Sequence, residues 1–378
     1  MNHPVSTRPT RVLPGLLFLP LMAVDASAQL GHPLSPLYDA SVAPSAGLVP
    51  GLQGAFRQQI LVSASRFVAL KGKTLVGIQL RRDPARTEAL RGGRVAMEVR
   101  VGLAKNGASQ ASEVFADNWQ GTASLVLQAD VTIPNSPARP APRPLWDAND
   151  TVHLGFTGGF KLGDQDVCIE LIGRPVTGVE PWMWYLDFER GNGNGKITPF
   201  GRSCSSFHAD GQSLHARSTR LQIGSTLEIT LLGRPASNPL LLIGGAALRP
   251  GLDLAPLGAP GCMQHIQPIW NLPLTYRAPP MRFPFAIADF ATRIPADPAL
   301  LDTSTFLQAA DLETSTSGKT NRGGLTTSNA LELRLSKNAP TLGLSTVESH
   351  SVAPTSPMPQ RGVVDVERGP VMRWVYRD

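Results

Sequence analysis

Short stretches in which apolar residues alternate with other residues, separated by turns, recur along most of this chain and constrain its fold more than any other feature. In 95–103 (VAMEVRVGL) the alternation places Val and Met side chains on one face of a strand and the intervening side chains on the other. Gly and Pro, at 36 and 34 of 378 residues, supply many turns, and no segment has a long helical period. The sequence therefore predicts an all-β fold of two sandwich-like, jelly-roll-like antiparallel domains.

A glycine-rich segment near the middle of the chain, 190–196 (RGNGNGK), predicts the boundary between the domains. It does not fit a phosphate-binding loop, because Ile197 stands where that motif needs Ser or Thr. After residue 335 the chain is rich in Ser, Thr and Pro up to residue 360, so we expect loose packing there, whereas 363–376 is either a final strand pair or a docking tail. The predicted divisions are a signal peptide at 1–28, a linker at 29–49, an N-terminal β-sandwich at 50–192, a second β domain at 198–335 and a tail at 336–378.

The N-terminus has the features of a secretory signal peptide. Arg8 and Arg11 precede an apolar run at 12–24, and an A-x-A sequence at 26–28 follows. The run is shorter than the roughly 20 residues that a membrane-spanning helix needs. We therefore expect a secreted, periplasmic or cell-surface protein with no transmembrane segment after cleavage of the leader. The alternative is a disordered apolar N-terminus.

The charge of the chain argues against nucleic acid as a partner. The formal net charge is +6 over 378 residues, and the longest run of Arg or Lys is Arg81-Arg82. Nucleic-acid binding needs basic residues gathered into a patch or stripe, and the sequence contains no such cluster.

Three cysteines, Cys168, Cys204 and Cys262, allow one disulfide and one free thiol in an exported protein. All three pairings are open, but we favour Cys204–Cys262, since both lie beside turn residues, whereas Cys168 lies in an apolar strand pattern where a buried thiol is common. Cys204 and Cys262 with His208 and His265 also have the composition of a Cys2His2 zinc site. A disulfide and a zinc site are mutually exclusive, and an assay of free thiols separates them.

Two turns rich in oxygen ligands suggest calcium as a cofactor. Asp147, Asn149 and Asp150 form one turn, and Asp164 and Asp166 form the other. Neither turn matches the twelve-residue calcium loop. The competing interpretation is that these residues stabilise turns through their own side chains.

A second cluster of potential metal ligands is formed by His208, Asp210 and His215, within a polar loop where plain solvent exposure is the competing explanation. The remaining candidate is aromatic: Trp182, Trp184 and Tyr185 could form a flat platform for a sugar ligand. Alternation places Trp182 and Trp184 on one face of a strand, so a pair of core residues is the alternative.

The second half of the chain carries a recognisable order of short motifs, including 233–244 (GRPASNPLLLIG), 258–262 (GAPGC) and 324–331 (GLTTSNAL). Over about residues 198–335 it resembles exported, functionally uncharacterised β-rich proteins abundant in planctomycetes. The first half is more loosely similar to modules that precede this region, at 57–60 (RQQI), 65–67 (SRF) and 115–118 (FADN). The resemblance implies an exported or surface protein and supplies no catalytic residues.

The sequence contains neither G-x-S-x-G nor H-E-x-x-H, so no catalytic, cofactor-binding or metal-binding residue is assigned from a motif. Asp253, Glu180 and Asp187 are acids available to a glycosidase, but no spacing pairs them. The leading hypothesis is a secreted or cell-surface binding or structural module that engages glycans or envelope components. The alternatives are a secreted hydrolase of polysaccharide or protein, and a purely architectural envelope component.

Overall fold

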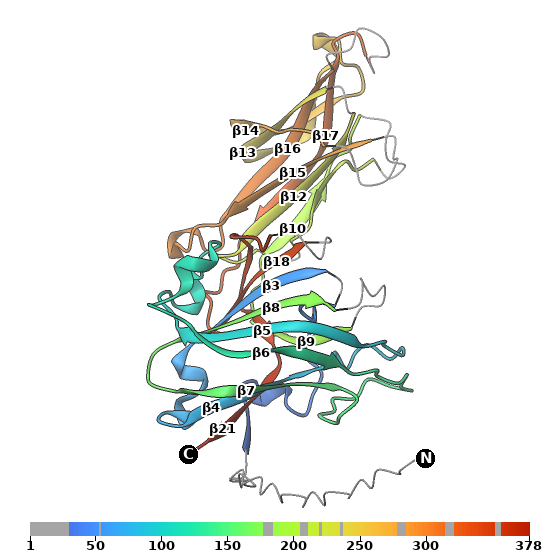
Figure 1. The fold of residues 1–378 in the computed structure, drawn as a ribbon. Helices are drawn as coiled ribbons and strands as arrows, with labels where there is room; N and C mark the ends of the chain where they lie inside the picture. Colours follow the sequence, from blue (N-terminus) through green and yellow to red (C-terminus); the bar gives the residue numbers. More distant parts are fainter. Residues whose placement is uncertain are drawn as a thin grey trace, which may run out of the picture.

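The computed structural model describes residues 30–52, 54–176, 184–204, 211–218, 221–234, 237–277, 285–313, 321–351 and 357–378. These residues form β-strands joined by turns and by 3-10 helices of three or four residues (Figure 1), which confirms the predicted all-β fold. Within the described ranges, no helix has the length and apolar character needed to cross a membrane.

One group of strands forms a six-stranded antiparallel sheet with two smaller sheets beside it. The six strands, in spatial order, are β19 (Val363–Val366), β18 (Leu344–Ser351), β3 (Ala55–Val62), β8 (Val167–Pro175), β5 (Gly93–Leu103) and β6 (Ser124–Ile133). A four-stranded sheet has the order β1 (Leu30–Pro33), β21 (Met372–Arg377), β4 (Thr74–Arg81) and β7 (Thr151–Lys161). A three-stranded sheet has the order β2 (Ser45–Leu48), β9 (Tyr185–Arg190) and β20 (Arg368–Pro370).

The predicted alternation of β5 builds the core of this first group. Val95, Met97, Val99 and Val101 are buried in one apolar cluster with side chains from the smaller sheets, while the intervening Arg100 is exposed. Burying each such side chain contributes roughly 1.5–3 kcal/mol relative to leaving it in water. The strand is therefore held with one face toward the core, as the sequence predicted.

The second group is a smaller sandwich. Its five-stranded sheet has the order β10 (Lys196–Phe200), β17 (Leu325–Arg334), β16 (Ser304–Glu313), β13 (Ser237–Asp253) and β14 (Met263–Pro273). The opposing sheet has the order β11 (Leu214–Ala216), β12 (Thr226–Gly233) and β15 (Ala286–Arg293). Ile229 on β12 and Leu241 and Leu307 on the larger sheet are buried in the core between them.

Strand pairing differs from the predicted divisions at both ends of the chain. The segment 336–360, expected to pack loosely, supplies β18, which pairs with β3 over eight residues. β19, β20 and β21 begin within 363–376, which was expected to be either a strand pair or a docking tail. The red strands therefore lie among the blue and green ones in Figure 1, and the second group is inserted between β9 and β18. The prediction of loose packing at 336–360 was wrong for β18, because Ser345 and Thr346 are fully buried and only look like surface residues in the sequence.

The segment expected to be a linker, 29–49, is also built into the fold from residue 30 onward. β1 pairs with β21 and β2 pairs with β9. Between them, the guanidinium of Arg81 donates to the carbonyl oxygens of Tyr38, Asp39 and Ser41 at 2.7–2.9 Å. Arg81 is fully buried beside the carboxylate of Asp187, so its charge is compensated while it holds this arm against the sheet.

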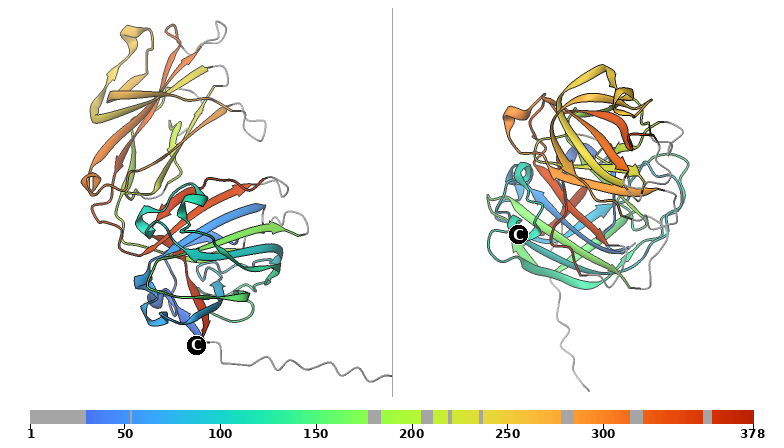
Figure 2. Two further views of the ribbon diagram at one scale, coloured as in Figure 1. Left: turned by 60° about the vertical axis from the view of Figure 1, so that its left-hand side comes forward. Right: turned by 90° about the horizontal axis from the view of Figure 1, so that it is seen from above.

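The two segments that connect the strand groups, 191–195 and 335–343, are bound to each other. The Asn194 Oδ1 accepts hydrogen bonds from the Lys337 backbone N (3.0 Å) and the Ser336 Oγ (3.2 Å). The Asn338 Nδ2 donates to the carbonyl oxygen of Asn192 at 3.1 Å. The glycine-rich segment is therefore a connection between the two strand groups, which lie one above the other in Figure 2.

A direct contact also joins the two groups at the edge strand β19. The backbone N–H of Val364 donates to the Thr226 hydroxyl (2.9 Å), and that of Val366 donates to the Ser225 hydroxyl (3.0 Å). These hydroxyls satisfy edge N–H groups that would otherwise need water or another strand. The junction is thus a specific polar contact.

Candidate functional site

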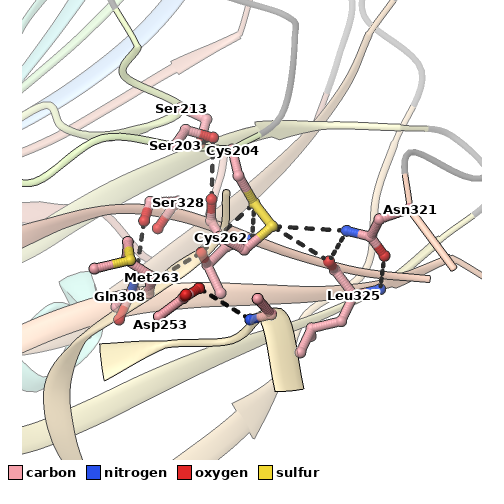
Figure 3. Close-up of a disulfide and its surroundings, with 12 residues drawn as sticks. Ser203, Cys204, Ser213, Asp253, Cys262, Met263, Gln308, Asn321, Leu325 and Ser328 are labelled. Carbon is pink, nitrogen blue, oxygen red and sulfur yellow. Dashed lines mark hydrogen bonds between the residues drawn. A yellow bond between two sulfur atoms is a disulfide. The ribbon is translucent and has the colours of Figure 1, made fainter. Parts of the chain in front are cut away.

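The predicted disulfide between Cys204 and Cys262 is present and is confirmed (Figure 3). Cys262 directly precedes β14, after a turn in which Gly258 and Gly261 both have φ of +79°, a conformation that favours glycine. The Thr327 backbone N donates to the Cys204 Sγ at 3.1 Å. The bond therefore ties the β13–β14 hairpin to the segment after β10, beside β17.

The disulfide removes the zinc hypothesis, since neither Cys204 nor Cys262 is a free thiolate and His208 lies outside the described residues. Across the described part of the chain, no three His, Cys, Asp or Glu residues are grouped as metal ligands. Cys168 is the buried free thiol that the sequence suggested, and burial raises its pKa well above the ordinary value. A buried thiol of this kind is a packing residue.

The aromatic platform hypothesis is wrong for Trp184. This side chain is only 1% exposed and belongs to the core of the first strand group, where its Nε1 donates to the Ser136 hydroxyl at 3.0 Å. Tyr185 is half-buried, with the Arg86 guanidinium 4.2 Å from its ring centroid. Trp182 lies outside the described residues. The physical reason is burial, because this large aromatic side chain, directly before β9, fills the sandwich core.

The first proposed calcium turn uses its carboxylates within the protein. The Asp147 Oδ1 accepts from the Asn149 backbone N at 3.0 Å, which is the turn-stabilising bond that formed the competing interpretation. Asp150 is buried and forms ion pairs with Arg82 and Arg139. Its carboxylate is thus already neutralised by two guanidinium groups.

The carboxylates of the second proposed calcium turn also have partners within the protein. Asp164 forms an exposed ion pair with Lys71, and the Asp166 Oδ1 accepts from the Ala64 backbone N at 2.8 Å. In the predicted histidine cluster, His208 and Asp210 lie outside the described residues, so only His215, on β11, can be placed.

Of the three acids considered for hydrolysis, the two that the structure describes are not brought together. Asp187 is buried against Arg81, and burial raises its pKa to about 6. The exposed Asp253 accepts from the Ala255 backbone N at 2.9 Å and so stabilises a turn. Glu180 lies outside the described residues. Asp187 and Asp253 thus have separate, structural roles.

A polar cavity of about 290 Å³ lies at the junction of the two strand groups, and it is the strongest candidate for a functional site. Three guanidinium groups, three carboxylates and one imidazole line it, supplied by Arg190, Arg217, Arg368, Glu228, Glu348, Asp365 and His350. They come from β9, β12, β18, β19, β20 and the segment after β11. The opposite charges are equal in number, so the lining is close to neutral overall.

Arg368 is the central group of the cavity wall and is held from several sides. Its guanidinium lies 4.3 Å from the Phe188 ring centroid, and its Nη2 donates to the Ala46 carbonyl at 2.6 Å. The Nη1 lies 3.5 Å from Glu348 Oε1, and the Nε lies 3.6 Å from Asp365 Oδ2. Arg368 therefore fixes both carboxylates in one place.

The two carboxylates on this wall have further partners. The Gln58 Nε2 donates to Glu348 Oε1 at 2.7 Å, and the Arg190 Nη2 lies 3.4 Å from Asp365 Oδ2. Burial raises the pKa of Asp365, and the neighbouring Arg368 and Arg190 oppose this shift. Its side chain keeps 35% of its area accessible, and it lines the cavity.

The opposite wall is supplied by the second strand group and is less constrained. The half-exposed Arg217 donates from Nη2 to Asp289 Oδ1 at 3.1 Å. Burial raises the pKa of Glu228, and Arg217 opposes the shift. Within the described ranges, neither the Glu228 carboxylate nor the ring nitrogens of His350 have a hydrogen-bond partner. The His350 ring packs on Phe56, with 4.4 Å between the ring centroids. These two groups are available to a ligand.

The motifs of the first half that carried the resemblance contact each other in the fold. The Asn118 Nδ2 donates to Gln59 Oε1 at 2.9 Å, and the Gln59 Nε2 donates to Glu170 Oε1 at 3.0 Å. The Arg57 guanidinium pairs with Glu170 and lies 4.3 Å from the Phe115 ring centroid. They fasten the 104–119 segment to the six-stranded sheet, a structural role.

Sequence reasoning missed most of the cavity, because Glu348, His350, Asp365 and Arg368 lie in the segment expected to be a tail. No local pattern distinguishes them from solvated residues. It also missed Trp270 on β14, an exposed aromatic side chain that keeps 70% of its area accessible.

No model of a known protein family matches this chain, and no curated protein sequence matches it significantly.

Proposed function

We propose that this protein is an exported binding protein that holds a small, neutral, hydroxyl-rich ligand, such as a terminal sugar of a glycan, in the junction cavity. The observation that carries the proposal is the balanced lining of three guanidinium groups and three carboxylates around about 290 Å³. Export is the expectation from the leader sequence.

The chemistry of the lining favours this ligand class. Sugar hydroxyls both donate and accept hydrogen bonds, and guanidinium groups supply fixed donors while carboxylates supply fixed acceptors. A strongly charged ligand would disturb the balance of the existing ion pairs and would leave one partner buried without its counter-charge. The cavity volume is near the lower end of the roughly 300–1,000 Å³ typical of ligand pockets, which limits the ligand to one small unit.

A hydrolase is the second candidate, because Glu348 and Asp365 line the same cavity. In glycosidases the two carboxylates face each other across the scissile bond, with space for substrate or water between them. Here the Arg368 guanidinium contacts both carboxylates, at 3.5 and 3.6 Å. This arrangement supports binding over hydrolysis.

The test is a glycan-array screen with the purified chain, followed by titration of the best ligand against Arg217→Ala. Arg277→Ala is the matched control, because Arg277 also pairs with Asp289 and is equally exposed but does not line the cavity. We expect Arg217→Ala to weaken binding by roughly tenfold, the value of one charged hydrogen bond, and Arg277→Ala to leave it unchanged.

Three outcomes overturn this assignment. Equal effects of the two Arg variants would show that the cavity is not the site, and loss of binding in Trp270→Ala alone would move the site to the face of β14. Sugar release that Glu348→Gln abolishes would replace binding by hydrolysis.

A further inference from the structure

The segment that connects the two strand groups contains two of the three Asn-Gly pairs in the chain, Asn192-Gly193 and Asn194-Gly195; the third is Asn106-Gly107. An Asn-Gly pair is chemically labile, since glycine has no Cβ to keep its backbone nitrogen away from the preceding side chain. The structure holds the three asparagine side chains very differently. We propose that Asn192 is a spontaneous modification site, at which deamidation loosens the junction between the strand groups.

The reaction needs only water. The Gly193 backbone nitrogen attacks the Asn192 Cγ, the bond between Cγ and the side-chain nitrogen breaks, and ammonia leaves with the proton from the Gly193 nitrogen. Water then opens the resulting succinimide ring. Opening at the side-chain carbonyl produces aspartate, and opening at the main-chain carbonyl produces isoaspartate, which places one extra methylene in the backbone.

Asn192 meets the requirements of this reaction. It is exposed, and residues 191–195 form neither helix nor strand. Within the described ranges its side-chain amide makes no hydrogen bond, and only its main-chain carbonyl is held, by Asn338. The side chain is therefore free to turn toward the Gly193 nitrogen.

Asn194 lacks this freedom. Its Oδ1 accepts hydrogen bonds from the Lys337 backbone N and the Ser336 hydroxyl. The following Gly195 is buried, and a Cβ there would lie 1.9 Å from the Leu221 carbonyl oxygen, so the backbone cannot move toward the side chain.

Asn106 is also restrained. Its Nδ2 donates to the Asp117 carbonyl at 3.1 Å and to Asn118 Oδ1 at 3.3 Å. These bonds must break before the Asn106 side chain can reach the Gly107 nitrogen. In the described part of the chain, the asparagine side chain of this motif is thus unpaired at Asn192 and hydrogen-bonded at Asn194 and Asn106.

Isoaspartate at position 192 would act directly on the junction. The Asn192 carbonyl binds Asn338, and Gly193 packs so closely on Gln222 that a Cβ would lie 2.9 Å from its Oε1. Gln222 in turn donates to the Asn338 carbonyl at 2.8 Å. An extra methylene displaces the hydrogen bond between the Asn192 carbonyl oxygen and Asn338 and strains the packing of Gly193 on Gln222. The neighbouring Arg190 lines the junction cavity, so ligand affinity should also fall, an effect that rests on the proposed function.

The test is prolonged incubation of the purified full chain in mildly alkaline buffer, with peptide mapping by fragmentation mass spectrometry and isoaspartyl methyltransferase labelling. We expect Asn192 to convert roughly fivefold faster than Asn106 or Asn194, the factor that one net hydrogen bond corresponds to. In denaturant the three sites should convert at similar rates. Equal rates in the folded chain, or faster conversion at Asn106 or Asn194, would overturn the proposal.

The effect on the junction has its own readout. Incubation should increase limited proteolysis at 191–195 in the native sequence and leave the Asn192→Gln chain unchanged. Equal change in both chains would show that deamidation does not loosen the junction. Because neither readout uses a ligand, failure of the glycan proposal would not affect either result.

Discussion

Replacing both cysteines of the disulfide, Cys204→Ala with Cys262→Ala, should destabilise the second strand group strongly. The bond joins residues separated by 58 positions and encloses β11, β12 and β13. Closing a loop of this length in the unfolded chain corresponds to about 4 kcal/mol of stabilisation by the chain-entropy relation. For a unit of this size the loss should lower the Tm by about 10–15 °C.

Thermal unfolding followed by calorimetry, with and without a thiol reductant, measures this effect. Reductant should lower the Tm of the native chain to that of the double variant and should leave the variant unchanged. Cys168→Ala is the control, because it removes the free thiol and should preserve the response to reductant. If the double variant melted within two or three degrees of the native chain, bonds that survive the substitutions, such as the 3.0 Å bond from the Thr327 hydroxyl to the Met263 carbonyl oxygen, would be holding the hairpin. The loop-closure argument would then be refuted.

Three further predictions concern buried polar groups. Arg81→Met should cost at least roughly 3–5 kcal/mol in urea unfolding, because it leaves the buried Asp187 without its cation. Adding Asp187→Leu should recover the part of the loss that comes from the unpaired carboxylate, but not the part from the three carbonyl oxygens that Arg81 binds. No recovery at all would contradict the argument. Burial raises the pKa of Asp187 to about 6, above the roughly 4 of an exposed aspartate. The folded state therefore binds this proton more tightly than the unfolded state does. Protonated Asp187 adds stability below about pH 4, and this stability disappears as the pH rises to 6. The free energy of unfolding of the native chain minus that of Asp187→Asn should therefore fall across this range, and a flat difference would argue against the shift. Asn118→Ala should cost at least about 2 kcal/mol, because it leaves the Gln59 Oε1 and the Ser112 backbone N–H unpaired. Faster hydrogen exchange in 104–119 is the local readout, and unchanged exchange would contradict the role given to Asn118.

Local patterns predicted the parts of this protein that depend on near neighbours in the chain. The alternation in 95–103 predicted β5, because successive side chains of a strand point to opposite faces regardless of its partners. Turn residues beside Cys204 and Cys262 favoured their pairing, since a disulfide needs two chain segments whose backbones can approach closely. These inferences needed no knowledge of the remaining fold.

Local patterns failed where burial depends on distant partners. β18 looks polar because Ser345 and Thr346 carry hydroxyls, yet both are fully buried beside β3 and β19. The aromatic residues around Trp184 are equally compatible with an exposed platform, and only tertiary packing places Trp184, directly before β9, in the core.

The sequence by itself thus determined the all-β class, the turn-rich strand pattern and the favoured disulfide, because each follows from interactions between residues close along the chain or from their composition. Only the tertiary structure decided that the last strands complete the first sandwich and that the second is inserted within it. The junction cavity was also decided only by the tertiary structure. Its walls come from both strand groups, which bring together Arg190, Arg217 and Arg368. Ion pairs between residues this far apart leave no local signal, since their energy depends on distances that the fold alone establishes.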